Sequence, residues 1–288
     1  MENNLVDFTW PEAGMPSVPY QGFCDPAVYA HEQERIFRGK TWSYVELEAE
    51  VPNPGDFKAT FIGDTPTMVS RDKEGALHVF VNRCAHRGAM VLRESRGNRK
   101  THTYIYHQWS YDLQGNLICV PFRKGINQQG GYGADFDTSK HSLQKLPAAT
   151  YNGLIFASFA SDIEPLEEDI GPAMRPWLDR VFNRPVQILG YARQFIHTNW
   201  KLYSENAKDL YHASLLHLFH TTFGIYRSSQ GGGINMDETG RHSMLRAYKK
   251  LRHKKWLPTR GHTSAAIRQT IVWPARYSSP HAKNLILN

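Results

Sequence analysis

The chain has 288 residues, of which 41% are hydrophobic and 21% charged; these values are ordinary for a globular protein and leave room for about two domains. Its apolar runs, such as 153–160, are far shorter than the roughly 18 residues needed to span a bilayer, and the polar N-terminus is unlike a signal peptide. Its three cysteines, Cys24, Cys84 and Cys119, are too few for a disulfide framework in a chain of this length. We therefore predict no membrane span and a reducing, cytoplasmic compartment.

The net charge of +7 is unevenly distributed. The last 50 residues contain 11 Lys or Arg and no acidic residue, whereas residues 1–238 contain 23 Lys or Arg and 27 Asp or Glu, a net charge of −4. A basic tail can bind nucleic acid or an anionic surface, but this one lacks the interleaved aromatic residues of an RNA module and any DNA-binding motif. We predict no nucleic-acid partner, and binding through the tail remains the minor alternative.

The chain begins with an irregular, proline-rich segment over residues 1–23. Asp25 is a favourable N-cap and Pro26 suits the first helical position, so a helix is predicted to begin there and to end at the next glycine. Ile36 and Phe37 are expected on its apolar face.

From residue 41 to residue 122 the pattern is typical of β-structure. Short segments rich in Val, Ile, Phe and Thr are separated by turn signals such as Pro54-Gly55, which predicts a small antiparallel sandwich or barrel. The predicted strands are 57–62, 67–71, 77–81, 103–107 and 117–122. The Gly-rich stretch 125–133 lacks the Lys-Ser/Thr ending of a phosphate-binding loop and is predicted to be a surface loop.

The second half of the chain is predicted to be mixed. Strands over 154–159 and 186–190 flank a helix over 165–181, and a long polar-rich helix follows over 199–220. Beyond Gly224 we expect a Gly/Ser-rich segment and then an irregular basic tail to residue 288.

The most informative motif is Cys84-x-His86 followed by Tyr104-x-x-His107. Two Cys and two His in the order C-x-H…C-x-x-H hold a Rieske [2Fe–2S] cluster, in which the sulfurs bind one iron and the imidazoles the other. Three of these ligands are in place, and Tyr104 stands at the position of the second cysteine. The alternative, in which these are ordinary sandwich residues, requires both spacings to be coincidental. Trp109 is expected to cover the site.

Tyr104 is a poor substitute for a cysteine. Its phenolic oxygen lies further from the backbone than a cysteine sulfur does, and its reference pKa of about 10 makes the anion costlier than a thiolate. Cys119 lies 12 residues beyond His107 and is not expected to face the cluster. We predict a cluster that is absent, partial or labile.

The stretches NRCAHRGA and YHQWSYDLQGNL resemble the Rieske domain of the large (alpha) subunits of aromatic ring-hydroxylating oxygenases, and the matching features run from about residue 19 to residue 220. The resemblance implies that Cys84, His86 and His107 bind the cluster. It also implies a mononuclear Fe(II), which is expected to be weak or absent here, and an aromatic acid substrate. The implied partners are an oxygenase small (beta) subunit, a ferredoxin and a ferredoxin reductase, in a homo- or hetero-oligomer.

A second motif, Asp209-x-x-His212-x4-His217, resembles the mononuclear iron site of the same family. The resemblance implies that His212 and His217 bind the iron and that Asp209 passes electrons from a neighbouring subunit's cluster. A spacing of five residues places two side chains roughly 140° apart on an ideal helix, so a shared metal requires an irregular helix. His217 and His220, three residues apart, are the alternative pair on geometry alone.

The carboxylate that completes the iron site in the family lies further along the chain. Here Asp237 and Glu238 are the last acidic residues, and neither is marked as a ligand by its surroundings. We therefore expect a C-terminally truncated catalytic domain. Within the family, DLYHASLLHLFH is most similar to the salicylate 5-hydroxylase and anthranilate dioxygenase branch, and to salicylate 5-hydroxylase in particular.

The sequence as a whole predicts an α+β fold: an antiparallel β Rieske domain followed by a partial helix-grip-like catalytic domain. The expected divisions are an N-terminal segment and helix (1–40), the Rieske-type domain (41–150) and the catalytic domain with its basic tail (151–288). The predicted function is the large oxygenase component of a salicylate 5-hydroxylase-like system, impaired by Tyr104 and by the missing part of the iron site. The alternative is a non-catalytic module that docks an oxygenase small subunit or a ferredoxin.

Overall fold

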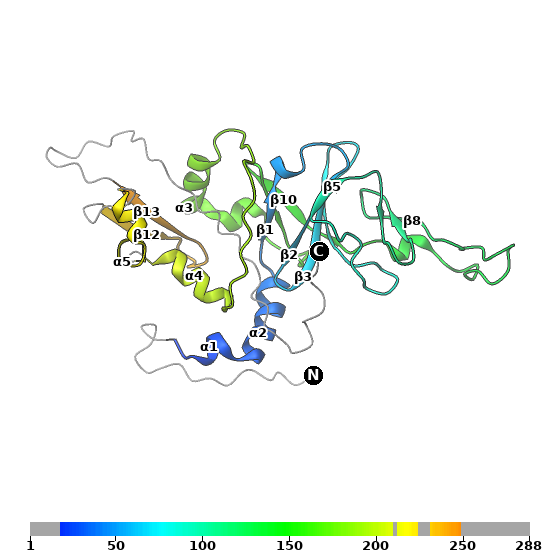
Figure 1. Ribbon diagram of the computed structural model, residues 1–288, viewed down its shortest axis with the longest axis horizontal. Coiled ribbons are helices and arrows are strands. Elements are labelled where there is room, and N and C mark those ends of the chain that lie inside the picture. Colours follow the sequence, from blue (N-terminus) through cyan, green and yellow to red (C-terminus); the bar gives the residue numbers. More distant parts are fainter. Residues whose placement is uncertain (1–17, 210–211, 224–230, 249–288) are drawn as a thin grey trace.

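The computed structural model describes residues 18–209, 212–223 and 231–248 (Figure 1). The helices are α1 (Gln21–Cys24), α2 (Pro26–Glu32), α3 (Leu166–Val181), α4 (Trp200–Lys208), α5 (His212–Leu215) and α6 (Leu218–Thr222), with a π-helix η1 (Gln33–Phe37) and the 3-10 turns η2 (Glu48–Glu50) and η3 (Thr138–His141). In the described part of the chain, every helix is too short or too polar to cross a membrane.

The strands form four antiparallel sheets, as the sequence predicts for the Rieske-type part. Their orders are β5-β2-β3-β4-β9, β1-β11-β10, β6-β7-β8 and β12-β13. The bounds are β1 (Ser43–Leu47), β2 (Asp56–Ile62), β3 (Thr65–Arg71), β4 (Leu77–Val81), β5 (Arg96–Asn98), β6 (His102–Thr103), β7 (Ser110–Tyr111), β8 (Leu117–Cys119), β9 (Lys145–Leu146), β10 (Ala148–Tyr151), β11 (Leu154–Ala157), β12 (Gly231–Met236) and β13 (Ser243–Tyr248).

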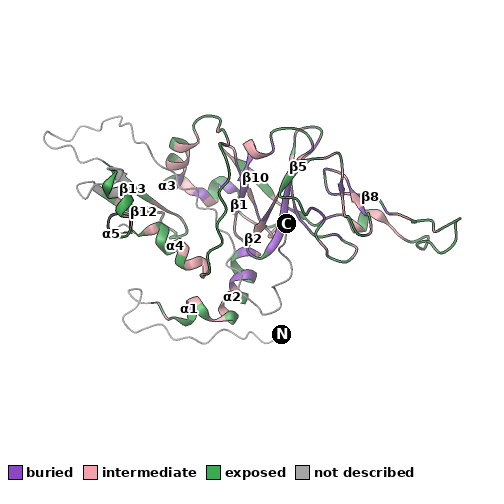
Figure 2. Cartoon of the chain, viewed as in Figure 1, coloured by how far each residue is buried: buried purple, intermediate pink, exposed green. Residues whose placement is uncertain are grey.

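The five-stranded sheet is buried on both faces at its centre. Successive side chains of a strand point to opposite faces, so Met68 joins the core under the β6-β7-β8 sheet while Val69 joins the core against β1 and β11. On β4, Phe80 likewise joins the first of these cores and Val81 joins the second. Figure 2 shows the buried residues gathered in the central strands, whereas α4 has none.

A buried ion cluster links η2 to β1 and β2. Lys58 lies 2.9 Å from a carboxylate oxygen of Glu46 and also pairs with Glu50, and all three side chains are nearly inaccessible to solvent. One ammonium group faces two carboxylates here, so one carboxylate is favoured in its protonated form. Burial, together with the hydrogen bond to Glu50, raises the pKa of Glu46 to about 8.

This cluster makes stability depend on pH in a defined direction. Glu46 keeps its proton in the folded chain up to about pH 8 but loses it near pH 4.5 when unfolded, so the free energy of unfolding should fall as the pH rises through that window. Glu46→Gln mimics the protonated form. In urea unfolding it should match the wild type at pH 5 and be more stable by about 1–2 kcal/mol at pH 8.5. Glu34→Gln, which removes the exposed partner of Arg38, is the control; an equal gain there would refute this account.

The N-terminal helix begins where the sequence predicts, but its buried face differs from the predicted one. The side chain of Asp25 accepts a hydrogen bond from the Ala27 amide at 2.7 Å, and Pro26 is the first helical residue. From Gln33 the helix continues as η1, whose wider turn changes the spacing of side chains. Phe37 is therefore buried, whereas Ile36 is 38% exposed, contrary to expectation.

Five further predictions are wrong. A short helix, α1, occurs within the stretch expected to be irregular, and no strand forms over 186–190. The predicted strand 103–107 ends at Thr103, and the residues that follow form a turn. The helix expected over 199–220 is divided into α4, α5 and α6, and the hairpin β12-β13 lies where an irregular tail was expected. The rest of that tail, 249–288, lies outside the described residues.

Candidate functional site

The first candidate site begins with a tight turn at Cys84. The Cys84 amide donates to the Ala89 carbonyl and the Gly88 amide donates to the Cys84 carbonyl, each at 2.8 Å. Gly88 has a φ of +72°, a conformation that L side chains rarely adopt, which explains the glycine. The turn leaves the thiol of Cys84 buried, in the core that also contains Trp109.

Tyr111 supplies a polar partner to that thiol. Its hydroxyl oxygen lies 3.1 Å from Cys84 Sγ and accepts a hydrogen bond from the Ala85 amide, also at 3.1 Å. Burial raises the pKa of Tyr111 well above its usual range, so the phenol keeps its proton and can donate it towards a thiolate. Sequence reasoning did not single out Tyr111; its position two residues beyond Trp109 was the available signal.

His86 and His107 come together as a pair. Their rings are perpendicular with centroids 4.6 Å apart, and both Nδ1 atoms are buried without a hydrogen-bond partner among the described residues. Burial lowers the pKa of His86, so its imidazole is neutral near pH 7, the form that binds metals. Trp109 stacks on His86 with centroids 5.0 Å apart, as the sequence predicts. Two buried, unsatisfied nitrogens fit a pair of metal ligands.

Tyr104 occupies the turn that leads to His107. Its carbonyl accepts a hydrogen bond from the Gln108 amide at 2.8 Å, and Gln108 has a φ of +57°. The Tyr104 ring packs partly buried against the core containing Cys84, with its centroid 5.9 Å from that of His107. The fourth donor position therefore supplies a phenol in place of a thiolate.

Cys119 does not supply the missing thiolate ligand. It lies on β8 opposite Ser110, and its side chain is exposed to solvent whereas Cys84 is buried. Among the described residues, no group of three His, Cys, Asp or Glu side chains lies close enough together to hold a single metal ion. The thiol thus stands apart from the imidazole pair, as in a cluster whose sulfur and nitrogen ligands bind different irons. Three donors fit a Rieske cluster, and the set is one thiolate short.

The second candidate site lies where the predicted long helix is broken. α4 ends at Lys208, Asp209 is extended, and α5 then begins at His212. His217 falls in the short gap between α5 and α6, which brings its Nε2 to 2.7 Å from the Nε2 of His212. The break removes the angular separation that an unbroken helix would impose. The side chain of His220, the alternative partner of His217, lies outside the described part of the structure.

No third ligand joins these imidazoles in the described part of the chain. Asp209 caps α4 and is not grouped with the two histidines. Asp237 lies in the turn of the β12-β13 hairpin, where its carboxylate accepts hydrogen bonds from Thr239 Oγ1 at 2.5 Å and from the His242 amide at 3.0 Å. The two imidazoles fit two of the three ligands of a two-His, one-carboxylate iron site.

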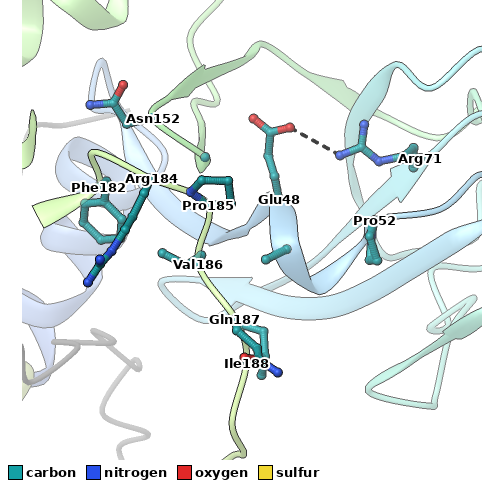
Figure 3. A pocket seen from close by; sticks show the side chains of 12 residues that line it. Glu48, Pro52, Arg71, Asn152, Phe182, Arg184, Pro185, Val186, Gln187 and Ile188 are labelled. Carbon is teal, nitrogen blue, oxygen red and sulfur yellow. Dashed lines mark hydrogen bonds and ion pairs between the residues drawn. The ribbon is translucent and has the colours of Figure 1, made fainter.

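A cavity of about 810 Å³ lies elsewhere, between η2 and the segment that follows α3 (Figure 3). Glu48 and Arg71 form an ion pair at one side of it, with N and O 3.3 Å apart. Arg71 also donates to the carbonyls of Val51 and Gly75, each at 2.6 Å, so each of its three side-chain nitrogens has an acceptor. None of the predicted site residues lines this cavity, and it is not the substrate pocket of either histidine pair.

Comparisons with known proteins relate the chain to one kind of oxygenase subunit. Residues 41–130 match the family description "Rieske [2Fe-2S] domain". The chain is 52% identical to the anthranilate 1,2-dioxygenase large subunit of Burkholderia cepacia over 93% of its own length and 61% of the relative's. It is 46% identical to the large oxygenase component of salicylate 5-hydroxylase from Ralstonia sp., covering 83% of this chain and 58% of that one.

The fold is shared with solved structures of the same kind. The crystal structure of naphthalene 1,2-dioxygenase from Rhodococcus sp. bound to indole superposes with a TM-score of 0.70 and 28% identity, covering 82% of this chain and 54% of that chain. The chain spans about three-fifths of the length of the relatives that are 45–52% identical to it.

Proposed function

We propose that this chain, which belongs to the large subunits of Rieske-type aromatic ring-hydroxylating oxygenases, is the oxygenase component of a cytoplasmic system that hydroxylates an aromatic carboxylic acid. The observation that carries the proposal is the convergence of two separate histidine pairs, His86 with His107 and His212 with His217. The names of the relatives support anthranilate or salicylate as the substrate class.

The residues of the first site are suited to an electron-entry centre. A [2Fe–2S] cluster, when bound, supplies one-electron transfer. Towards it, His86 and His107 present unpaired buried nitrogens, Tyr111 holds a proton towards the sulfur of Cys84, and Trp109 excludes water from the His86 ring. Tyr104 leaves this site one thiolate short, which supports an oxygenase with impaired electron entry.

The two sites lie far apart within one chain. β8, beside the first site, is at one end of the long axis, and α5, which carries His212, is at the other (Figure 1). This separation favours delivery of electrons to the iron site of a neighbouring subunit, past Asp209, and so supports an oligomer as part of the proposal. The proposed partners are an oxygenase small subunit, a ferredoxin and a ferredoxin reductase that draws on NAD(P)H.

The second candidate is a non-catalytic module that docks a small subunit or a ferredoxin. The phenol of Tyr104 at the thiolate position favours it, because a site that cannot hold a cluster retains only its fold. Purification together with an oxygenase small subunit, without bound iron, is the result expected from this alternative.

Iron analysis of three proteins distinguishes the two. The wild type, a His86→Ala/His107→Ala variant and a His212→Ala/His217→Ala variant are purified anaerobically and assayed for iron and for hydroxylation of salicylate and anthranilate. Under the proposed function, each double variant loses the iron that its own histidine pair binds. The turnover of the wild-type chain is far below that of the Burkholderia cepacia relative assayed in parallel. Wild-type iron content in both double variants would contradict the proposal.

A further inference from the structure

The N-terminal helices hold the first turn of α4, the helix that leads to His212 and His217. Glu32, the last residue of α2, is buried, and one of its carboxylate oxygens accepts a hydrogen bond from Trp200 Nε1 at 2.8 Å. The other oxygen pairs with Lys201 Nζ. A buried carboxylate is costly to desolvate, and these two partners compensate that cost only when α4 begins at this position.

Two further contacts fix the same end of α4. Asn199 caps the helix by accepting a hydrogen bond from the Lys201 amide at 3.0 Å, while its Nδ2 donates to the Phe23 carbonyl at 2.9 Å. The Trp200 ring meets the Phe37 ring edge-on, with centroids 5.3 Å apart. The start of α4 is therefore attached to the N-terminal helices at several points.

The opposite side of these helices is anchored to the five-stranded sheet. Gln33, next to Glu32, accepts a hydrogen bond through Oε1 from the Asp64 amide at 2.9 Å, in the turn between β2 and β3. Gly63 in that turn has a φ of +58°, and a Cβ added there would lie 2.3 Å from Gln33 Oε1 and 2.7 Å from Phe37 Cβ. This close approach connects α2 and η1 to the sheet with little freedom to move.

From these contacts we infer that Glu32 is a positioning residue: through Trp200 and Lys201 it fixes the direction of α4 and so holds the His212–His217 pair in a set relation to the Rieske-type domain. This role rests on the proposed function, in which the His212–His217 pair binds the mononuclear iron. A helix of nine residues is about 13 Å long, so a tilt of about 10° at Trp200 would displace the far end by about 2 Å. The carboxylate acts on the site through α4 and does not touch it.

A distance measurement tests this inference. Cu²⁺ is bound at His212 and His217, a nitroxide is attached to the exposed Cys119 in a Cys24→Ser background, and pulsed EPR reports the distribution of distances between them. His212→Ala identifies the signal that belongs to this pair and not to His86 and His107. In the wild type we expect one narrow distribution.

Glu32→Ala should at least double the width of that distribution in protein whose circular dichroism remains native. Glu32→Gln keeps an acceptor for Trp200 and should restore most of the narrow distribution. Glu205→Gln, which removes an exposed ion pair with Lys208 on the same helix, is the matched control and should leave the width unchanged.

If Glu32→Ala fails to fold, Trp200→Phe serves instead, because it removes the donor to Glu32 and retains a ring against Phe37; it too should broaden the distribution. An unchanged width in the folded variants overturns the inference, as does the absence of any His212-dependent distance in the wild type. The proposed function is judged separately, on iron content and turnover.

Discussion

Anaerobically purified Tyr104→Cys protein should contain about two irons and two sulfides per chain and show a Rieske EPR signal after reduction with dithionite, whereas the native chain should hold well under half of that sulfide. The other three donors are already in place: a buried thiol at Cys84 and two imidazoles, His86 and His107, whose Nδ1 atoms lack partners. The reference pKa of a cysteine thiol is about 1.5 units below that of a tyrosine phenol, so the thiolate is less costly to form than the phenolate.

The same substitution should change stability in two opposing steps. Without a cluster, loss of the Tyr104 ring from the core around Cys84 should cost about 1–2 kcal/mol, since that ring is only partly buried. A ligand that binds only the folded state raises stability by mass action, so the loaded variant should melt at a higher temperature than the native chain.

Two controls separate the thiol from the change in volume. Tyr104→Ser removes the ring without adding a sulfur and should bind no more sulfide than the native chain. Cys119→Ala, introduced into Tyr104→Cys, should leave the cluster content unaltered, because Cys119 is exposed on β8. A full complement of sulfide in the native chain would show that Tyr104 or Cys119 serves as the fourth ligand.

Acid should destabilise the fold by about 3 kcal/mol through one buried side chain, His102. His102 lies on β6, with Nε2 2.9 Å from Ser70 Oγ and no described partner for its buried Nδ1. Burial, with a smaller contribution from the charge of Arg99, lowers its pKa to about 4. Between pH 6.5 and 4 the unfolded chain binds a proton at this residue and the folded chain does not, so the free energy of unfolding falls as the pH falls through that window.

Urea unfolding at intervals from pH 7 to pH 4.5 measures this dependence. His102→Gln should be less stable than the wild type at pH 7, because the site is shaped for an imidazole, but it should lose about 2–3 kcal/mol less on acidification. His197→Gln, which removes an exposed histidine, should retain the wild-type slope. Equal slopes in the wild type and His102→Gln would rule out His102 as the source.

The central strands could be predicted because their sequence carries local information. The turn signals place β2, β3 and β4 within two residues of their observed bounds. Both metal-type motifs were also visible, because their spacing is short and their residue types are uncommon in combination. The helix start at Asp25 and Pro26 follows from capping chemistry alone.

The errors occur where tertiary contacts or backbone strain override local preference. The residues from Tyr104 to His107 have strand-like composition, but the positive φ of Gln108 turns the chain there. The helix-favouring stretch after Asn199 breaks near Asp209, which no helix propensity indicates. The contact between Glu32 and Trp200 joins segments 168 positions apart, and such pairs cannot be read from periodicity in a single sequence.

That long-range contact also sets an order of events during synthesis. Glu32 leaves the ribosome long before Trp200, and at typical bacterial or eukaryotic rates the interval is on the order of ten to thirty seconds. Throughout that time the N-terminal helices have no α4 to pair with, and the carboxylate of Glu32 remains hydrated. The β-rich part can form its own contacts first, because its strands pair mostly with close neighbours in sequence. Under the proposed function, the second histidine pair is therefore held in place only late in the synthesis of this chain.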